Sequence, residues 1–116
     1  MQERRQNVRV RPMADYAITA DVGTGLIKTV AAVLDAAVGG LSLVLATPFA
    51  DLPAGSELRM RVTLPGLERF ETVGTIRHTQ GRVGGRCGVH LNHLTPEQQT
   101  ALSKTVSELL ERGGAV

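Results

Sequence analysis

The sequence predicts a mainly β fold, a small antiparallel barrel or sandwich that is followed by a C-terminal helix. Apolar and polar residues alternate in several short runs, and a period of two is typical of half-buried strands. Glycine and proline turns separate these runs at short intervals, as in small antiparallel barrels and sandwiches. After residue 95 the apolar spacing becomes that of a helix. At 116 residues, the chain has room for one core and not for two.

The first two expected strands form a hairpin. The first runs from Met13 to Val22, where every second residue is apolar or aromatic from Ala14 onward. A turn is expected at residues 23–25, since two of these three residues are glycine. The second strand runs from Leu26 to Leu34, and we expect Asp35 to break it.

Four more strands complete the expected β-structure, at residues 41–45, 58–64, 70–79 and 86–91. The clearest alternation lies in the run 58–64, where Leu58, Met60 and Val62 are separated by Arg59 and Arg61. One face of this strand should therefore be buried and the other should be exposed.

The helix is expected at about residues 95–112. Thr95 can cap its N-terminus, Pro96 suits its first position, and Gln98 stands three residues after the cap, as in a capping box. Gly113 is a suitable stop. Four apolar residues recur at spacings that place them on one stripe, which should pack on the barrel and close its mouth: Leu102, Val106, Leu109 and Leu110.

Positive charge is concentrated at the N-terminus. The net charge is only +2, yet four arginines occupy the first eleven residues beside one acid, Glu3: Arg4, Arg5, Arg9 and Arg11. Arginine favours planar, bidentate contacts with anions over diffuse attraction. We therefore expect a flexible, arginine-rich arm over residues 1–12 and a folded domain over residues 13–116. A solvated, disordered tail is the alternative for any terminal charge run.

Composition excludes several classes of protein. Aromatic residues make up only 3% of the chain, so a nucleic-acid surface built on base stacking is not expected. Cys87 is the one cysteine, which excludes an internal disulfide and suggests a core residue. No apolar run approaches eighteen residues and the N-terminus is charged, so we expect neither membrane insertion nor secretion but a cytoplasmic protein.

Neither a catalytic nor a metal site is expected. No nucleophile and base form a recognisable motif, and Ser42 lacks a G-x-S-x-G context, so the chain is interpreted as a non-enzyme. His78, His90 and His93 would need a carboxylate or cysteine partner to form a metal site. Without such a cluster, surface histidines are the simpler interpretation.

Two separated segments suggest a nucleotide ligand. Arg5 and Arg9 place two guanidinium groups four residues apart, and Asp35 stands before a turn rich in small residues that includes Gly39 and Gly40. Guanidinium groups suit phosphate oxygens and the O6/N7 edge of guanine, whereas a carboxylate can accept from guanine N1–H and N2–H. A ligand made of guanines and phosphates would use both segments. Taken alone, the second segment is also what a plain hairpin turn uses.

These segments resemble the two motifs of the PilZ domain, a bacterial receptor module for cyclic di-GMP. Arg5 and Arg9 match the R-x-x-x-R motif, and Arg4 supplies the doubled arginine. Asp35 and Gly40 match the outer positions of D/N-x-S-x-x-G. Residues 87–91 resemble the closing G-V-x-F strand, with leucine in place of the aromatic residue. The resemblance implies a six-stranded antiparallel barrel with a C-terminal helix.

The resemblance also implies the ligand site: Arg4, Arg5, Arg9, Asp35, Ala37, Gly39 and Gly40. One position departs from the motif, because Ala37 stands where the family has serine. Loss of one hydrogen bond costs roughly 0.5 to 3 kcal/mol, about 2-fold to 100-fold in affinity. Binding of cyclic di-GMP would therefore be weakened rather than abolished.

The implied function is that of a stand-alone second-messenger receptor with no cofactor, whose arm becomes ordered when cyclic di-GMP binds. It would signal to an unidentified downstream protein effector. Ala37 favours an alternative, a PilZ-like adaptor that has lost the nucleotide and acts through protein contacts. Nonspecific binding of nucleic acid through the arm is a third possibility, which the nearly balanced charge of the remaining chain disfavours.

Overall fold

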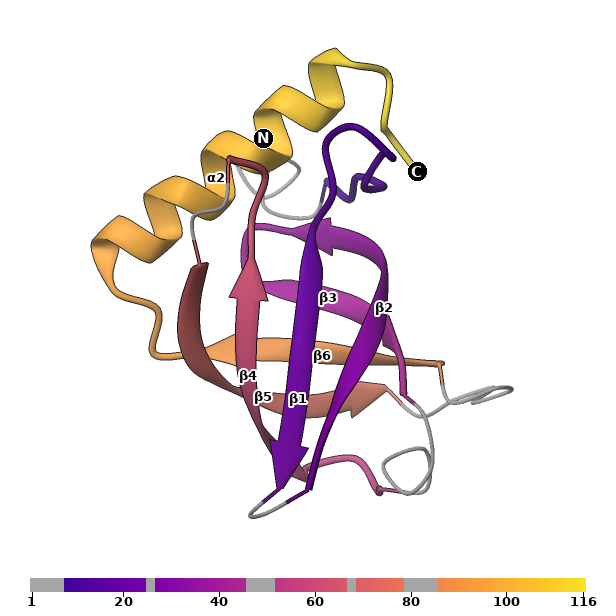
Figure 1. Cartoon of the computed structure of the whole chain (residues 1–116), viewed down its shortest axis with the longest axis vertical. Helices are drawn as coiled ribbons and strands as arrows, with labels where there is room; N and C mark the ends of the chain where they lie inside the picture. Colours follow the sequence, from indigo (N-terminus) through magenta and orange to yellow (C-terminus); the bar gives the residue numbers. More distant parts are fainter. Residues whose placement is uncertain (1–7, 25–26, 46–51, 67–68, 79–85) are drawn as a thin grey trace.

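The computed structural model describes residues 8–24, 27–45, 52–66, 69–78 and 86–116. Within them, six antiparallel strands close into a barrel in the order β1-β2-β3-β6-β5-β4 (Figure 1). The elements are β1 (Thr19–Thr24), β2 (Ile27–Ala37), β3 (Gly40–Val44), β4 (Glu57–Thr63), β5 (Arg69–His78), β6 (Arg86–Asn92) and α2 (Pro96–Glu111). The mainly β class and the six-stranded barrel with a C-terminal helix are confirmed.

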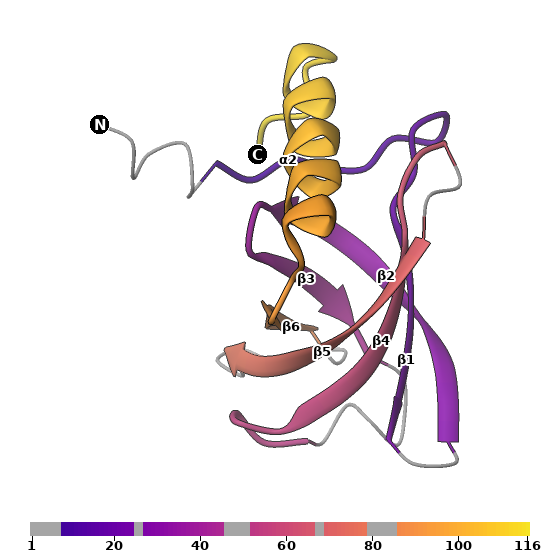
Figure 2. The same cartoon turned by 90° about the vertical axis from the view of Figure 1, so that its left-hand side faces the viewer.

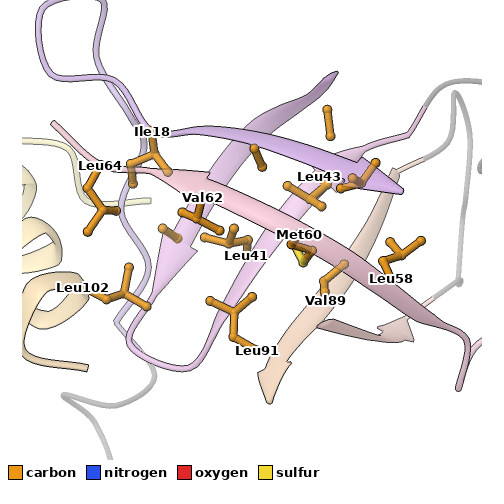
Figure 3. Packing of buried hydrophobic residues seen from close by; sticks show 14 of the residues in the cluster. Ile18, Leu41, Leu43, Leu58, Met60, Val62, Leu64, Val89, Leu91 and Leu102 are labelled. Atoms are coloured by element: carbon orange, nitrogen blue, oxygen red, sulfur yellow. The ribbon is translucent and has the colours of Figure 1, made fainter. Parts of the chain in front are cut away.

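The barrel is filled by the apolar faces of its strands (Figure 3). In β4, Leu58, Met60 and Val62 are buried and the arginines between them are exposed, as the alternation predicts. Cys87 is buried in the same core. Leu102 of α2 points into this interior and is fully buried. Val106 and Leu109 are also buried, so this face of the helix packs on one end of the barrel. Leu110, which was expected on the same stripe, is 43% exposed.

Helix α2 begins and ends at the expected signals. The Thr95 side chain accepts from the Gln98 amide at 3.1 Å, and the Gln98 side chain accepts from the Thr95 amide at 3.0 Å, which completes the capping box. Gly113 follows the helix with φ of +84°, a left-handed conformation in which glycine carries no steric cost. Among the described residues, no helix is both long and apolar enough to cross a membrane.

The segment before β1 is a turn, not a strand. The expected strand began at Met13, but β1 begins at Thr19. Met13 and Tyr16 exchange backbone hydrogen bonds of 3.0 and 3.2 Å, which closes a tight turn. The Tyr16 hydroxyl donates to Glu108 of α2, and Arg112 lies 4.3 Å from the centre of the Tyr16 ring. The apparent alternation here therefore reflects packing of a turn on the helix.

Strand β2 continues past Asp35, contrary to the prediction that it breaks there. Val33 pairs with Leu43 and Asp35 pairs with Ser42, so Leu34 is an extra residue in a β-bulge. A bulge lets a strand absorb one residue and changes which side chains face outward. The connection from β2 to β3 is correspondingly short and consists of Val38 and Gly39.

Candidate functional site

The chain is anchored to the barrel before residue 12, inside the segment expected to be a flexible arm. Val10 is fully buried, and it exchanges two backbone hydrogen bonds of 2.8 Å with Ala36 of β2. On its other side it forms a bridge with Ala115. The segment therefore lies between the end of β2 and the C-terminal residues, beside α2 (Figure 2). Residues 1–7, which include Arg4 and Arg5, lie outside the described residues.

This anchor fixes Arg9 over the junction of β2 and β3. Its Nε atom donates to Asp35 Oδ1 at 2.5 Å, and its Nη2 atom donates to Ser42 Oγ at 2.9 Å. The side chains of Arg9 and Asp35 are 38% and 20% exposed, so water only partly screens the pair. The bulge at Leu34 makes this possible, because it places Asp35 opposite Ser42 on the outer face.

An open hollow of about 440 Å³ lies beside Arg9 on the outer face of β3 and β6. Two of the residues that border it are glycines and have no side chain, Gly40 of β3 and Gly88 of β6. Gly40 pairs with His90, and Gly88 pairs with Ser42. Gly88 stands between the buried Cys87 and Val89, so alternation points it outward. The residues around the hollow are Arg9, Ala37, Gly39, Gly40, Leu41, Ser42, Arg77, Gly88, Val89 and His90.

Gly40 has a second role, which is close packing of the β2–β3 turn against β6. A Cβ atom on Gly40 would lie 2.7 Å from the carbonyl oxygen of Val89, whereas a Cβ atom on Gly39 would meet nothing within 4 Å. The Gly39 carbonyl accepts from the Leu91 amide at 2.9 Å. A side chain at position 40 would therefore push the turn away from its partner strand.

The residues that the sequence predicted for the ligand site, as far as the structure describes them, lie close together around Arg9. Arg9, Ala37, Gly39 and Gly40 all border the hollow, whereas Asp35 lies behind Arg9 and does not line it. Asp35 therefore holds Arg9 in this structure, and one of its oxygens is already occupied. If the Asp35 carboxylate accepts hydrogen bonds from a guanine, Arg9 must either release this carboxylate or share it with the base.

Six residues around the hollow were missed by the sequence interpretation, and three of them have polar side chains: Ser42, Arg77 and His90. Ser42 could have been found, because it alternates with the apolar Leu41 and Leu43 and so must face outward. Arg77 and His90 come from β5 and β6, and only the strand order brings them beside β3.

The hollow is suited to an anion and not to a metal. Arg9 and Arg77 are its charged residues, and it is open to solvent rather than enclosed. Throughout the described ranges, no group of three or more His, Cys, Asp or Glu side chains is placed to hold a metal ion. His90 borders the hollow, and His93 lies in the turn after β6 with φ of +53°.

Solved structures share this fold at low sequence identity. The PilZ domain of YcgR from Escherichia coli, solved with c-di-GMP, is 14% identical, with 94% of each chain covered and a TM-score of 0.68. The K. pneumonia MrkH–c-di-GMP complex is 15% identical (94% of this chain, 54% of that chain, TM-score 0.73). The Bacillus subtilis inhibitor of motility MotI/DgrA is 20% identical (93% and 52%, TM-score 0.69).

The chain thus spans about half the length of MrkH and of MotI/DgrA, and almost all of the YcgR domain. No curated protein matches the sequence. The sequence matches the PilZ domain family over residues 3–108, which is nearly its whole length. This protein belongs to the PilZ domain family.

Proposed function

We propose that this protein is a receptor for cyclic di-GMP that acts in the bacterial cytoplasm by binding, without catalysis. The observation that carries the proposal is the position of Arg9. Two side-chain hydrogen bonds and an anchored backbone hold its guanidinium at the edge of a hollow with a glycine-lined centre. A fixed guanidinium beside exposed backbone suits a ligand that combines phosphates with flat bases.

The hollow has the size and chemistry for part of such a ligand. About 440 Å³ lies within the range of roughly 300–1,000 Å³ that is typical of small-molecule sites. The missing side chains of Gly40 and Gly88 let a base or a phosphate approach the backbone closely. The YcgR and MrkH structures named above were solved with c-di-GMP, and this supports the same ligand class here.

Arg4 and Arg5 would complete the site from the chain that precedes the anchor. Four residues separate Arg5 from Arg9, so an extended chain places their Cα atoms at most about 14 Å apart. This separation is short enough for Arg5 to contribute to a site that contains Arg9. Ordering of residues 1–7 on the bound ligand would change the surface near α2 that a downstream protein effector meets.

The test is calorimetric titration of the protein with cyclic di-GMP, with GMP and cyclic di-AMP as controls. We expect micromolar or weaker binding that is selective for the guanine dinucleotide. Arg5→Ala and Arg9→Ala should lower the affinity at least about tenfold, because each removes charged hydrogen bonds. Ala37→Ser should tighten binding, since it adds a hydroxyl beside Gly40.

Ala37 favours a second candidate, a PilZ-like adaptor that does not bind nucleotide. Ala37 is 5% exposed and borders the hollow, where the family motif has a serine hydroxyl. If both the parent and Ala37→Ser show no heat with cyclic di-GMP at millimolar concentration, the receptor proposal is wrong. The adaptor then remains, acting through protein contacts alone.

A further inference from the structure

We propose that Arg77 of β5 contacts a guanine of the ligand from the wall of the hollow that faces Arg9. This inference rests on the proposed function and adds to it a residue outside both sequence motifs. Arg77 borders the same hollow as Arg9, although it comes from a strand on the other side of β6. A base lying over Gly88 would then have a guanidinium on each side.

A local irregularity of β5 places Arg77 there. Ile76 pairs with Val89 and His78 pairs with Gly88, so Arg77 is the extra residue of a β-bulge. Bulges re-aim side chains and are common beside binding sites. Here the residue across the bulge is Gly88, whose missing side chain leaves the space next to Arg77 open.

Each of the two bulges sets the position of an arginine that borders the hollow. The bulge at Leu34 sets Asp35 against Ser42 and so fixes Arg9, and the bulge at Arg77 lies on the opposite side. Regular pairing links β3 to β6 between them. Bulges are over-represented beside functional sites, where they re-aim side chains.

In the described part of the chain, Arg77 differs from three other arginines, which form ion pairs. Arg9 pairs with Asp35, Arg61 with Glu71 and Arg112 with Asp15. Arg77 is exposed, and in those same ranges it forms no ion pair or side-chain hydrogen bond. As far as the described residues go, a ligand can therefore contact its guanidinium without displacing an ion-pair or hydrogen-bond partner.

The side chain of arginine can also supply a flat surface for a base in this hollow. None of its bordering residues is Phe, Tyr or Trp, so an aromatic platform for a base is absent among them. A guanidinium offers a flat face on which a base can stack and an edge of N–H donors for O6 and N7 of guanine. Lysine has the same charge but no flat face.

The test compares Arg77→Gln, Arg77→Lys and the matched control Arg69→Gln by titration with cyclic di-GMP. Arg69 is an exposed arginine on the same strand, away from the hollow. We expect Arg77→Gln to weaken binding about 10- to 100-fold, as loss of a charged hydrogen bond does. Arg77→Lys should stay at least about fivefold weaker than the parent, and Arg69→Gln should stay within about twofold of it.

A direct readout comes from the side-chain Nε–Hε resonance of Arg77, which should shift on ligand addition while that of Arg69 does not. The inference is overturned if Arg77→Gln binds like the parent while Arg9→Ala does not bind. It is also overturned if Arg69→Gln loses as much affinity as Arg77→Gln, or if Arg77→Lys binds like the parent. Absence of binding by both the parent and Ala37→Ser would instead remove the proposed function itself.

Discussion

The backbone amide of Val116 donates to the carbonyl oxygen of Arg9 at 3.1 Å. The guanidinium of the same arginine reaches Asp35 and Ser42. Arg9 is thus held by its backbone to the C-terminal residues and by its side chain to β2 and β3. Contacts made after the helix therefore help to set the position of a residue near the start of the chain.

Val116→Pro should weaken cyclic di-GMP binding. Proline has no amide hydrogen, so this variant loses the bond to the Arg9 carbonyl and holds the backbone there less firmly, while Val10 keeps its two bonds to Ala36. One hydrogen bond is worth about 0.5–1.5 kcal/mol, and we expect a loss of about 2- to 10-fold in calorimetric titration. Val116→Ala keeps the amide and is the control. Equal affinities for the two variants would show that the tail does not position Arg9.

Ser42→Ala should reduce the affinity without unfolding the protein. The variant loses the acceptor for one Arg9 nitrogen, while the bond from Arg9 to Asp35 remains. We expect binding weaker by about 3- to 30-fold, in line with a hydrogen bond to a charged group. The control Ser107→Ala changes an exposed serine of α2. A parent-like affinity for Ser42→Ala would mean that Asp35 alone fixes Arg9.

Gly40→Ala should destabilise the fold, and Gly39→Ala should not. The first variant places a methyl group 2.7 Å from the Val89 carbonyl oxygen, where backbone must move, whereas the second adds one into open space. Overpacking of this kind costs about 1–3 kcal/mol. Urea denaturation should show this loss for Gly40→Ala only. Equal midpoints for the two variants would contradict the close packing of the β2–β3 turn on β6.

Tyr16 should make stability fall at high pH. Its hydrogen bond to Glu108 raises the pKa of the phenol, as do burial and the negative charge of Glu108, against the opposing charge of Arg112. Because folding raises the pKa of Tyr16, its contribution to the free energy of unfolding is complete below the pKa in the unfolded chain, near 10. This contribution is lost as pH rises through the pKa in the folded protein.

The comparison of the parent with Tyr16→Phe measures this contribution. Chemical denaturation between pH 7 and pH 11 should show the parent to be more stable at neutral pH, by about 0.5–1.5 kcal/mol for one hydrogen bond. The difference should narrow above pH 10, since Phe cannot ionise. A difference that stays constant through this range would show that the phenol does not donate to Glu108.

Much of the fold was readable from the sequence because its signals are local. The alternation in β4 and the capping box of α2 each involve residues within a few positions of one another, and both were predicted. The turn at Met13–Tyr16 was mistaken for a strand, because Tyr16 packs on α2 across more than ninety residues of sequence. Local periodicity carries no information about such a partner.

The candidate site was partly readable for the same reason. Arg9 and Asp35 stand in short motifs, but the bulge that turns Asp35 outward depends on its pairing with β3. A strand break was expected at Asp35 because aspartate is rare within strands. Counting by twos from Ala31, which is buried, would also place Asp35 in the interior. Arg77 stands in no motif, and its place depends on the barrel order and on the bulge in β5.

The bulge in β2 also predicts what deletion of one residue would do to this strand. Val33 pairs with Leu43 and Asp35 pairs with Ser42, and these two partners are consecutive in β3 although Leu34 lies between Val33 and Asp35. Deleting the Leu34 codon would therefore restore unbroken pairing and leave Asp35 on the outer face. Asp35 would then keep its position beside Arg9 in a chain that is one residue shorter.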